Sequence, residues 1–267
     1  MPKTLIVITG PTAVGKTTAA IKIAQRFKCE IISADSRQIY RELSIGTAVP
    51  SKEELAAVKH HFIGSHTIFQ NYNASMFEKE ALDLIEKLFK KYDCIIMAGG
   101  SMLYIDAVCK GIDIMPDADP GIRKALNTRL RTEGVESLRL QLKQLDPDYY
   151  NETDLKNPVR IIHALEICLT SGKPYSSFRS NPSKNRPFKI LKTAINCDRD
   201  ELHRRINKRV DEMVGAGLEE EAGTFFKYKN LNALNTVGYR EFFDYFEGKI
   251  SRDKAIELIK RNTGRYA

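Results

Sequence analysis

The stretch Gly10-Pro11-Thr12-Ala13-Val14-Gly15-Lys16-Thr17 decides the fold of this chain. It fits the pattern G-x-x-x-x-G-K-[ST] of a phosphate-binding loop, whose backbone N–H groups wrap a polyphosphate while the lysine adds a positive charge. The glycines allow the sharp turn and the close approach of the backbone to the anion. The hydroxyl of Thr17 is the expected ligand of a Mg²⁺ ion. All eight residues are therefore predicted to form a phosphate site, although the loop alone does not identify the phosphate compound.

The patterns on either side of this loop predict an α/β fold. Apolar runs at residues 5–9, 30–34 and 94–98 predict buried strands. Residues 17–27 predict a helix whose N-terminus faces the anion. A further helix has apolar residues at helical spacing, namely Phe77, Ala81, Leu84, Ile85 and Leu88. Continuous apolar strands separated by helices are typical of a parallel sheet with helices on both faces, so we expect a P-loop-type core.

Three polar side chains are expected to meet at one edge of this sheet. Thr17, Asp35 and Ser101 each follow the end of a predicted strand. Ligands bind such sheets at the carboxyl ends of the strands, so this convergence indicates an active site.

The alternation of strands and helices stops near residue 111. The following segment has helical patterns with little strand signal, and a strand pattern returns at residues 188–195. We therefore expect an α/β core formed by residues 1–112 and 188–267, and an inserted helical subdomain formed by residues 113–187.

Two of the predicted helices have clear start signals. One begins with Asn157 as N-cap and Pro158 at the first helical position, and it ends before Gly172. The other follows Asp198, which with Glu201 predicts a capping box.

Composition narrows the class of protein. A chain of 267 residues suits one large domain or a domain with an insertion, and its net charge of +8 favours a polyanionic partner. The five cysteines are scattered without a C-x-x-C pair, as in proteins of a reducing compartment. No apolar run approaches the ~20 residues that span a bilayer, and the first run has only the length of a strand. We expect a soluble, cytoplasmic protein without a signal peptide.

A basic segment lies between Ile167 and Cys197. It contains six cations and no acidic residue, with aromatic residues between them: Lys173, Tyr175, Phe178, Arg179, Lys184, Arg186, Phe188, Lys189 and Lys192. Cations for phosphates and rings for unstacked bases are typical of single-stranded nucleic acid binding. A solvated surface loop explains the segment equally well. Arg123 and Arg160, each early in a helix of the insertion, are further candidates for phosphate contacts.

The residues after the second and third strands are the candidates for chemistry. Asp35 is either a Mg²⁺ ligand or a general base, and a purely structural turn is the less favoured role. Gln38 offers a donor and an acceptor to a nucleobase edge, or it is an exposed helix residue. Ser36 is a weaker candidate, and Arg37 is expected to face solvent. The hydroxyl of Ser101 either caps the next helix or faces the same cleft, and the two roles are compatible.

The helix after Asp198 predicts which arginines reach a phosphate. Its buried stripe consists of Leu202, Ile206, Val210, Met213 and Val214. Arg204 falls opposite this stripe and is expected to be solvated. Arg205 and Arg209 fall on its border, where a long side chain extends along the core into a cleft.

His60 and His61 do not predict a metal pair. Adjacent residues share no face of a helix or a strand, and no Cys or carboxylate has suitable spacing, so no zinc is expected.

Taken together, these segments resemble the tRNA dimethylallyltransferases, the tRNA isopentenyltransferase family. The likeness spreads over nearly the whole chain in family order, at residues 10–17 (GPTAVGKT), 35–40 (DSRQIY), 45–47 (IGT), 60–61, 99–104 (GGSMLY), 117–123 (DADPGIR), 157–166 (NPVRIIHALE), 198–221 and 238–239. Members of the family usually continue with a basic stretch and a tryptophan, whereas this sequence ends at Ala267 and contains no tryptophan.

The resemblance implies transfer of a dimethylallyl group from dimethylallyl diphosphate to the exocyclic amine of the adenosine 3′-adjacent to the anticodon in tRNA, with release of pyrophosphate. Asp35 is then the base, and Ser101, usually threonine in the family, holds the target nucleobase. The phosphate loop with Lys16, Mg²⁺ and Arg205 or Arg209 stabilises the pyrophosphate.

The resemblance also implies contacts with the anticodon stem-loop of tRNA. The residues implied are Asp35, Ser36, Arg37, Gln38, Ser101, Arg123, Val159, Arg160, Ile161, Ile162 and His163. We expect a monomer. The alternatives are a P-loop small-molecule kinase and prenyl transfer to a free adenine nucleotide, and both leave the basic insertion without a purpose.

Overall fold

The computed structural model describes residues 2–113, 115–116, 119–179 and 184–267. The chain forms two compact units, one of Met1–Lys110 with Asn185–Ala267 and the other of Gly111–Lys184. These bounds lie close to those expected for the core and the insertion.

The larger unit is built on a parallel sheet with the strand order β3-β2-β4-β1-β5. Its strands are β1 (Thr4–Thr9), β2 (Ile31–Ser33), β3 (His60–His61), β4 (Cys94–Ala98) and β5 (Lys189–Ala194). The predicted strands are confirmed to within a residue or two at their ends. Strand β3 was not predicted, because two histidines carry no apolar pattern.

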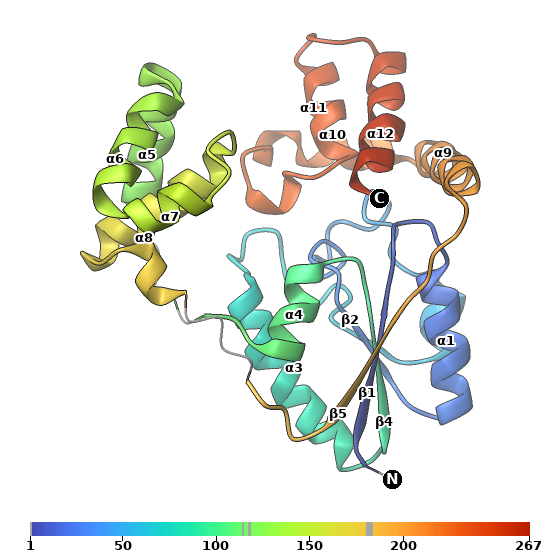
Figure 1. Cartoon of the computed structure of the whole chain (residues 1–267). Coiled ribbons are helices and arrows are strands. Elements are labelled where there is room, and N and C mark those ends of the chain that lie inside the picture. Colours follow the sequence, from blue (N-terminus) through green and yellow to red (C-terminus); the bar gives the residue numbers. More distant parts are fainter. Residues whose placement is uncertain (1, 114, 117–118, 180–183) are drawn as a thin grey trace. The chain divides into compact units, whose positions relative to one another are not determined.

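Helices cover both faces of this sheet, as predicted. The helices of the larger unit are α1 (Lys16–Phe27), α2 (Lys52–Ala57), α3 (Ala74–Phe89), α4 (Met102–Lys110), α9 (Arg199–Gly215), α10 (Leu218–Phe225), α11 (Tyr239–Phe246) and α12 (Arg252–Tyr266), with short 3-10 turns η2 (Phe226–Tyr228) and η3 (Asn232–Leu234). Helix α1 lies on one face, and α3 and α4 lie on the other (Figure 1). Ile6 and Ile8 pack with Ala20 and Ala24 of α1. Because alternate residues of a strand face opposite ways, the buried Leu5 points to the other layer.

The smaller unit is helical among its described residues. It contains α5 (Pro120–Glu133), α6 (Val135–Leu145), α7 (Pro147–Glu152), α8 (Pro158–Ser171) and the 3-10 turn η1 (Tyr175–Phe178). Its core includes Leu126, Leu138, Leu142 and Leu165. The predicted limits of α8 are confirmed, since the side chain of Asn157 accepts from the N–H groups of residues 159 and 160 and Gly172 ends the helix in the left-handed region.

Three of the six cations of the basic segment form ion pairs within the fold. Arg179 pairs with Glu152 at 2.6 Å, and Lys192 pairs with Asp106 at 3.1 Å. Arg186, whose side chain is 9% exposed, binds Glu78 at 2.8 Å. Two aromatic rings of the segment also have partners in the fold: Tyr175 packs on Tyr149, and Phe188 packs on Phe89. These five residues therefore have structural contacts within the fold, whereas Lys173 and Lys189 of the same segment are exposed.

Within the described ranges, we find no helix long and apolar enough to cross a membrane.

Candidate active site

The phosphate loop connects β1 to α1 and has the backbone conformation that its glycines predict. Gly10 has φ 146° and Gly15 has φ 99°, values that residues other than glycine rarely adopt. A Cβ at Gly10 would lie 2.3 Å from the carbonyl oxygen of Ile195, next to β5. Gly15 is also the N-cap residue of α1, so the loop presents the N-terminus of a helix, where anions bind.

Two cations lie at this loop. The Lys16 ammonium donates to the carbonyl oxygens of Gly10 at 3.0 Å and Pro11 at 2.7 Å. The Arg209 guanidinium on α9 donates to Thr12 Oγ1 at 3.2 Å. Burial lowers the pKa of both cations, while the charge of Asp35 raises it. Two partly desolvated cations and a helix N-terminus favour the binding of an anion here.

Asp35 lies in a tight turn directly after β2. Its Oδ1 accepts from the backbone N–H groups of Arg37 at 2.9 Å and Gln38 at 3.2 Å. Among the described residues no hydrogen bond reaches Oδ2, so this oxygen is oriented and available as a base. The turn thus fixes the carboxylate at the carboxyl edge of the sheet, as predicted.

Ser101 holds the same turn from the end of β4. Its Oγ accepts from the N–H of Ser36 at 2.8 Å and donates to Ser36 Oγ at 3.1 Å. The carbonyl of Ser101 accepts from the N–H groups of Tyr104 and Ile105, so its backbone starts α4 while its hydroxyl faces the turn. The paired glycines before it permit this approach, since a Cβ at Gly99 would lie 2.1 Å from the Ala34 carbonyl oxygen.

Two cavities meet at these groups. One has a volume of about 440 Å³ and the other about 560 Å³. The residues that line both are Thr12, Lys16, Asp35, Thr47, Ala48 and Arg209. The first cavity also contains Gly15 and Thr17 of the phosphate loop. The second extends to Ser36 and Ser101 and to apolar side chains that include Met102, Ile206 and Met213. Asp35 therefore lies where a phosphate site adjoins a space for a second compound.

Gln38 and Arg37 have contacts that the sequence did not reveal. The Gln38 amide donates to the carbonyl oxygens of Thr47 at 3.2 Å and Ala48 at 3.0 Å, so it is no exposed helix residue. Arg37 was expected to face solvent, and this is wrong. Its guanidinium donates to the carbonyl oxygens of Asn232 at 2.7 Å, Ala233 at 3.2 Å and Asn235 at 3.3 Å. No local pattern indicates a partner about 195 residues away.

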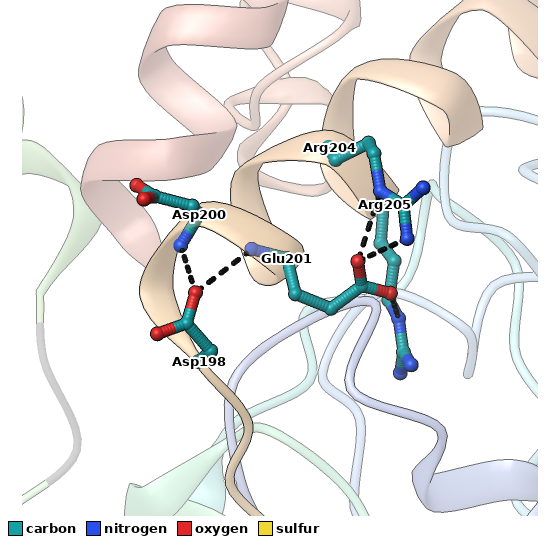
Figure 2. A network of polar contacts seen from close by, with 5 residues as sticks. All are labelled: Asp198, Asp200, Glu201, Arg204 and Arg205. Carbon is teal, nitrogen blue, oxygen red and sulfur yellow. Dashed lines mark hydrogen bonds and ion pairs between the residues drawn. The ribbon is translucent and has the colours of Figure 1, made fainter.

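The arginines of α9 differ more than the helix projection predicted. Arg209 lies at the phosphate loop, but Arg205 lines neither of the two cavities. Figure 2 shows the reason: Arg204 and Arg205 both bind the carboxylate of Glu201, at 2.9 Å and 2.6 Å. The Arg205 side chain is 45% exposed. The assignment of Arg205 to the phosphate is therefore corrected in favour of Arg209.

Figure 2 also corrects the capping box predicted for α9. Asp198 caps the helix as expected, because its Oδ1 accepts from the N–H groups of Asp200 at 2.8 Å and Glu201 at 3.3 Å. The Glu201 carboxylate forms ion pairs with Arg204 and Arg205, in place of the bond to the Asp198 N–H that a capping box requires.

Only some of the insertion residues implied for tRNA have accessible side chains. Ile161 and Ile162 are 0% and 6% exposed in the core of the insertion, which contradicts a side-chain role in tRNA contact. Val159 is 73% exposed, and Arg160 is exposed as well.

Arg123 and His163 lie around one buried carboxylate of the insertion. Arg123 Nε donates to Glu166 Oε1 at 2.8 Å, and the Glu166 side chain is 1% exposed. His163 Nδ1 lies 3.9 Å from Glu166, and burial lowers the pKa of His163. Arg123 thus first balances a buried charge, although half of its side chain reaches solvent.

His60 lies in the first cavity, which the sequence did not predict. Its Nδ1 bonds to the Val58 carbonyl oxygen at 2.8 Å, which makes Nδ1 the donor and Nε2 an acceptor in the neutral ring. Burial lowers the pKa of His60, which favours this neutral form. Its neighbour His61 pairs with Glu30 instead, because adjacent strand residues face opposite ways. Among the described residues, no group of three or more His, Cys, Asp or Glu could hold a metal ion.

The chain is similar to known proteins over nearly its whole length. The family model described as IPP transferase matches residues 38–267. tRNA dimethylallyltransferase 2 of Parabacteroides distasonis is 51% identical over 263 residues, which cover 98% of this chain and 88% of that protein. tRNA dimethylallyltransferase 2 of Azobacteroides pseudotrichonymphae is 54% identical, with 99% of this chain and 86% of that protein covered. The crystal structure of the tRNA isopentenylpyrophosphate transferase of Bacillus halodurans is 33% identical, with a TM-score of 0.68 over 99% of this chain and 84% of that one. The chain belongs to the IPP transferase family, whose curated members are named tRNA dimethylallyltransferases.

Proposed function

We propose that this protein transfers a dimethylallyl group from dimethylallyl diphosphate to the exocyclic amine of the adenosine 3′-adjacent to the anticodon in tRNA, releasing pyrophosphate. The observation that carries this proposal is the position of Asp35, which lines both the cavity of the phosphate loop and the adjoining cavity. A donor diphosphate fits the first, and an acceptor base fits the second.

The chemistry needs a base at this junction. The lone pair of an adenine amine is delocalised into the ring, so the amine is a weak nucleophile. As its nitrogen bonds to C1 of the dimethylallyl group, the C1–O bond breaks and its electron pair leaves with pyrophosphate. The proton of the attacking amine goes to Asp35, whose Oδ1 is held by two N–H donors while Oδ2 accepts.

The leaving pyrophosphate gains negative charge as the bond breaks. Lys16, Arg209 and the N–H groups at the start of α1 lie where they would stabilise that charge. Because these groups are fixed before the reaction, they need little reorganisation during it.

The first cavity offers a few protein oxygen atoms that could bind a Mg²⁺ ion. Thr17 and Asp35 offer oxygen ligands there, and Mg²⁺ usually binds few protein groups together with substrate phosphates. When bound, the ion would neutralise charge on the diphosphate. We propose Thr17 as its protein ligand.

The target adenosine must leave its stack to enter the second cavity, at a cost of roughly a few kcal/mol. Ser101 and Ser36 offer hydroxyls to the base in that cavity. On the insertion, the exposed Arg160 offers a cation to a phosphate of the tRNA, and the exposed Val159 offers an apolar contact.

One assay tests the proposal: labelled dimethylallyl diphosphate is incubated with unmodified tRNA, with AMP, and with neither. We expect the label in tRNA. Label found only in AMP would overturn the tRNA assignment. Loss of the γ-phosphate from ATP, without prenyl transfer, would identify a kinase instead.

A further inference from the structure

Glu221 of α10 binds a loop from a distant part of the sequence. Its Oε2 accepts from Ser44 N at 3.0 Å, Ser44 Oγ at 2.8 Å and Ile45 N at 2.9 Å. Its Oε1 accepts from Gly46 N at 2.9 Å and from the Tyr239 hydroxyl at 2.6 Å. One side chain thus receives five hydrogen bonds, and four of them come from the loop of residues 44–46, which we call the Glu221 loop.

The charge of Glu221 is stabilised by these donors. Burial raises the pKa of its carboxyl. Hydrogen bonds from the N–H groups of Gly46 and Ile45 and from the hydroxyls of Tyr239 and Ser44 lower this pKa by more, so the pKa lies below its ordinary value. Burial and the charge of Glu221 both raise the pKa of Tyr239, so its phenol keeps the proton that it donates. The pair is therefore a carboxylate and a neutral phenol at neutral pH.

The fit around the Glu221 loop is close. A Cβ built on Gly46 would lie 2.5–2.7 Å from the ring and hydroxyl of Tyr239. Tyr239 itself is fully buried, so its ring has little room to move. The loop is held by charge on one side and by packing on the other.

The Glu221 loop is connected to the proposed catalytic base through Gln38. The next two residues, Thr47 and Ala48, line both cavities, and their carbonyl oxygens accept from the Gln38 side-chain amide at 3.2 Å and 3.0 Å. The backbone N–H of Gln38 in turn donates to Asp35 Oδ1 at 3.2 Å. A continuous series of hydrogen bonds and peptide bonds thus joins Glu221 to Asp35.

We propose that Glu221 is a positioning residue that orients Asp35 through the Glu221 loop and Gln38. This inference rests on the proposed function, because it concerns the same proton transfer. Glu221 lines neither cavity, and its effect is on the rate of the chemical step. The proposed binding groups for the diphosphate are in the phosphate loop, and no residue of that loop takes part in the contacts of Glu221.

The test compares Glu221→Gln with Glu219→Gln. Glutamine has the same shape, but its NH₂ group cannot accept, so donors of the Glu221 loop lose their partner. Glu219 is the matched control, since it lies on the same helix and its carboxylate binds Arg252 at 2.6 Å instead of the loop. Tyr239→Phe is a milder second variant that removes one of the five bonds and keeps the ring.

Three measurements separate positioning from simple stabilisation: turnover per folded molecule, the Kd for dimethylallyl diphosphate, and amide hydrogen exchange of residues 44–48. For Glu221→Gln we expect faster exchange at these amides and a kcat lower by about 10²-fold, because small displacements of a catalytic group cost this much. The Kd for dimethylallyl diphosphate should stay within about twofold of wild type. Tyr239→Phe should also speed the amide exchange and lower kcat, each by less, and Glu219→Gln should match wild type.

A kcat for Glu221→Gln or Tyr239→Phe equal to that of Glu219→Gln, with faster exchange at residues 44–48, would overturn the inference. So would equal losses of kcat in all three variants. These outcomes differ from failure of the proposed function, in which the wild-type protein itself would transfer no label to tRNA.

Discussion

At the scale of single residues, the site depends on charges that are held in place before a substrate binds. Lys16 and Arg209 are partly buried beside Asp35, and the carboxylate moderates the loss of solvation of both cations. Asp35 is in turn fixed by two backbone N–H groups. In the proposed reaction, the two cations would stabilise the leaving pyrophosphate and the carboxylate would accept the proton.

Arg209→Ala should weaken binding of dimethylallyl diphosphate far more than Arg204→Ala or Arg205→Ala. Arg209 contacts the phosphate loop, whereas the other two bind Glu201 at the surface. The loss of one charge-assisted contact corresponds to about 1.5–3 kcal/mol, roughly a 10- to 100-fold increase in Kd. Isothermal titration of the three variants measures this directly. Equal effects of Arg205→Ala and Arg209→Ala would show that the assignment of Arg209 is wrong.

Donor affinity should also fall at high pH because of Lys16. Burial lowers the pKa of its ammonium below the ordinary 10.5. The cation is present below that lowered pKa and is lost as the pH rises through it, so the Kd for the diphosphate increases in that window. In Lys16→Arg the guanidinium stays protonated, and the alkaline increase should disappear. An alkaline limb that is identical in both proteins would assign it to another group.

At the scale of helices and strands, local signals predicted most of the structure. β4 was predicted because it is an apolar run followed by glycines, and α8 was predicted because Asn157 and Gly172 mark its two ends. Both signals come from residues that are neighbours in the sequence. β3 was missed because its two residues form a strand only through pairing with β2. The basic segment was ambiguous for a similar reason: the partner of Arg186 lies 108 residues away, and local sequence cannot show it.

Asn157→Ala should destabilise the insertion by about 1 kcal/mol, because the side chain caps the first N–H groups of α8. Asn157→Asp keeps an acceptor at the same place and should retain most of the stability. Urea denaturation followed by circular dichroism measures the difference in the free energy of unfolding. If both variants lose the same stability, the hydrogen bonds of the cap are not the cause.

At the scale of the whole molecule, the net charge of +8 is the feature that favours a polyanionic partner. The sequence predicted the insertion but not which of its residues are available, because burial of Ile161 and Ile162 depends on how four helices pack. Among the insertion residues implied for tRNA contact, the exposed Arg160 is the clearest candidate for a phosphate, since Arg123 balances Glu166.

Binding of tRNA should therefore weaken steeply with salt, and Arg160→Ala should reduce the slope of log K against log salt by about one. Arg204→Ala, which removes another exposed arginine, on the larger unit, should leave the slope near that of wild type. Filter binding between low and moderate salt measures both slopes. The same slope for Arg160→Ala and wild type would remove Arg160 from the tRNA surface.

The central claim, that Asp35 takes the proton from the adenine amine, is tested most directly by the transfer rate of Asp35→Asn. Asparagine keeps the shape and an oxygen that accepts the turn's two hydrogen bonds, but it cannot accept the proton. We predict that transfer of labelled dimethylallyl to tRNA falls by roughly 10²–10⁴-fold, the usual contribution of a general base, while tRNA and the diphosphate still bind. Turnover close to that of the wild-type protein would contradict the account.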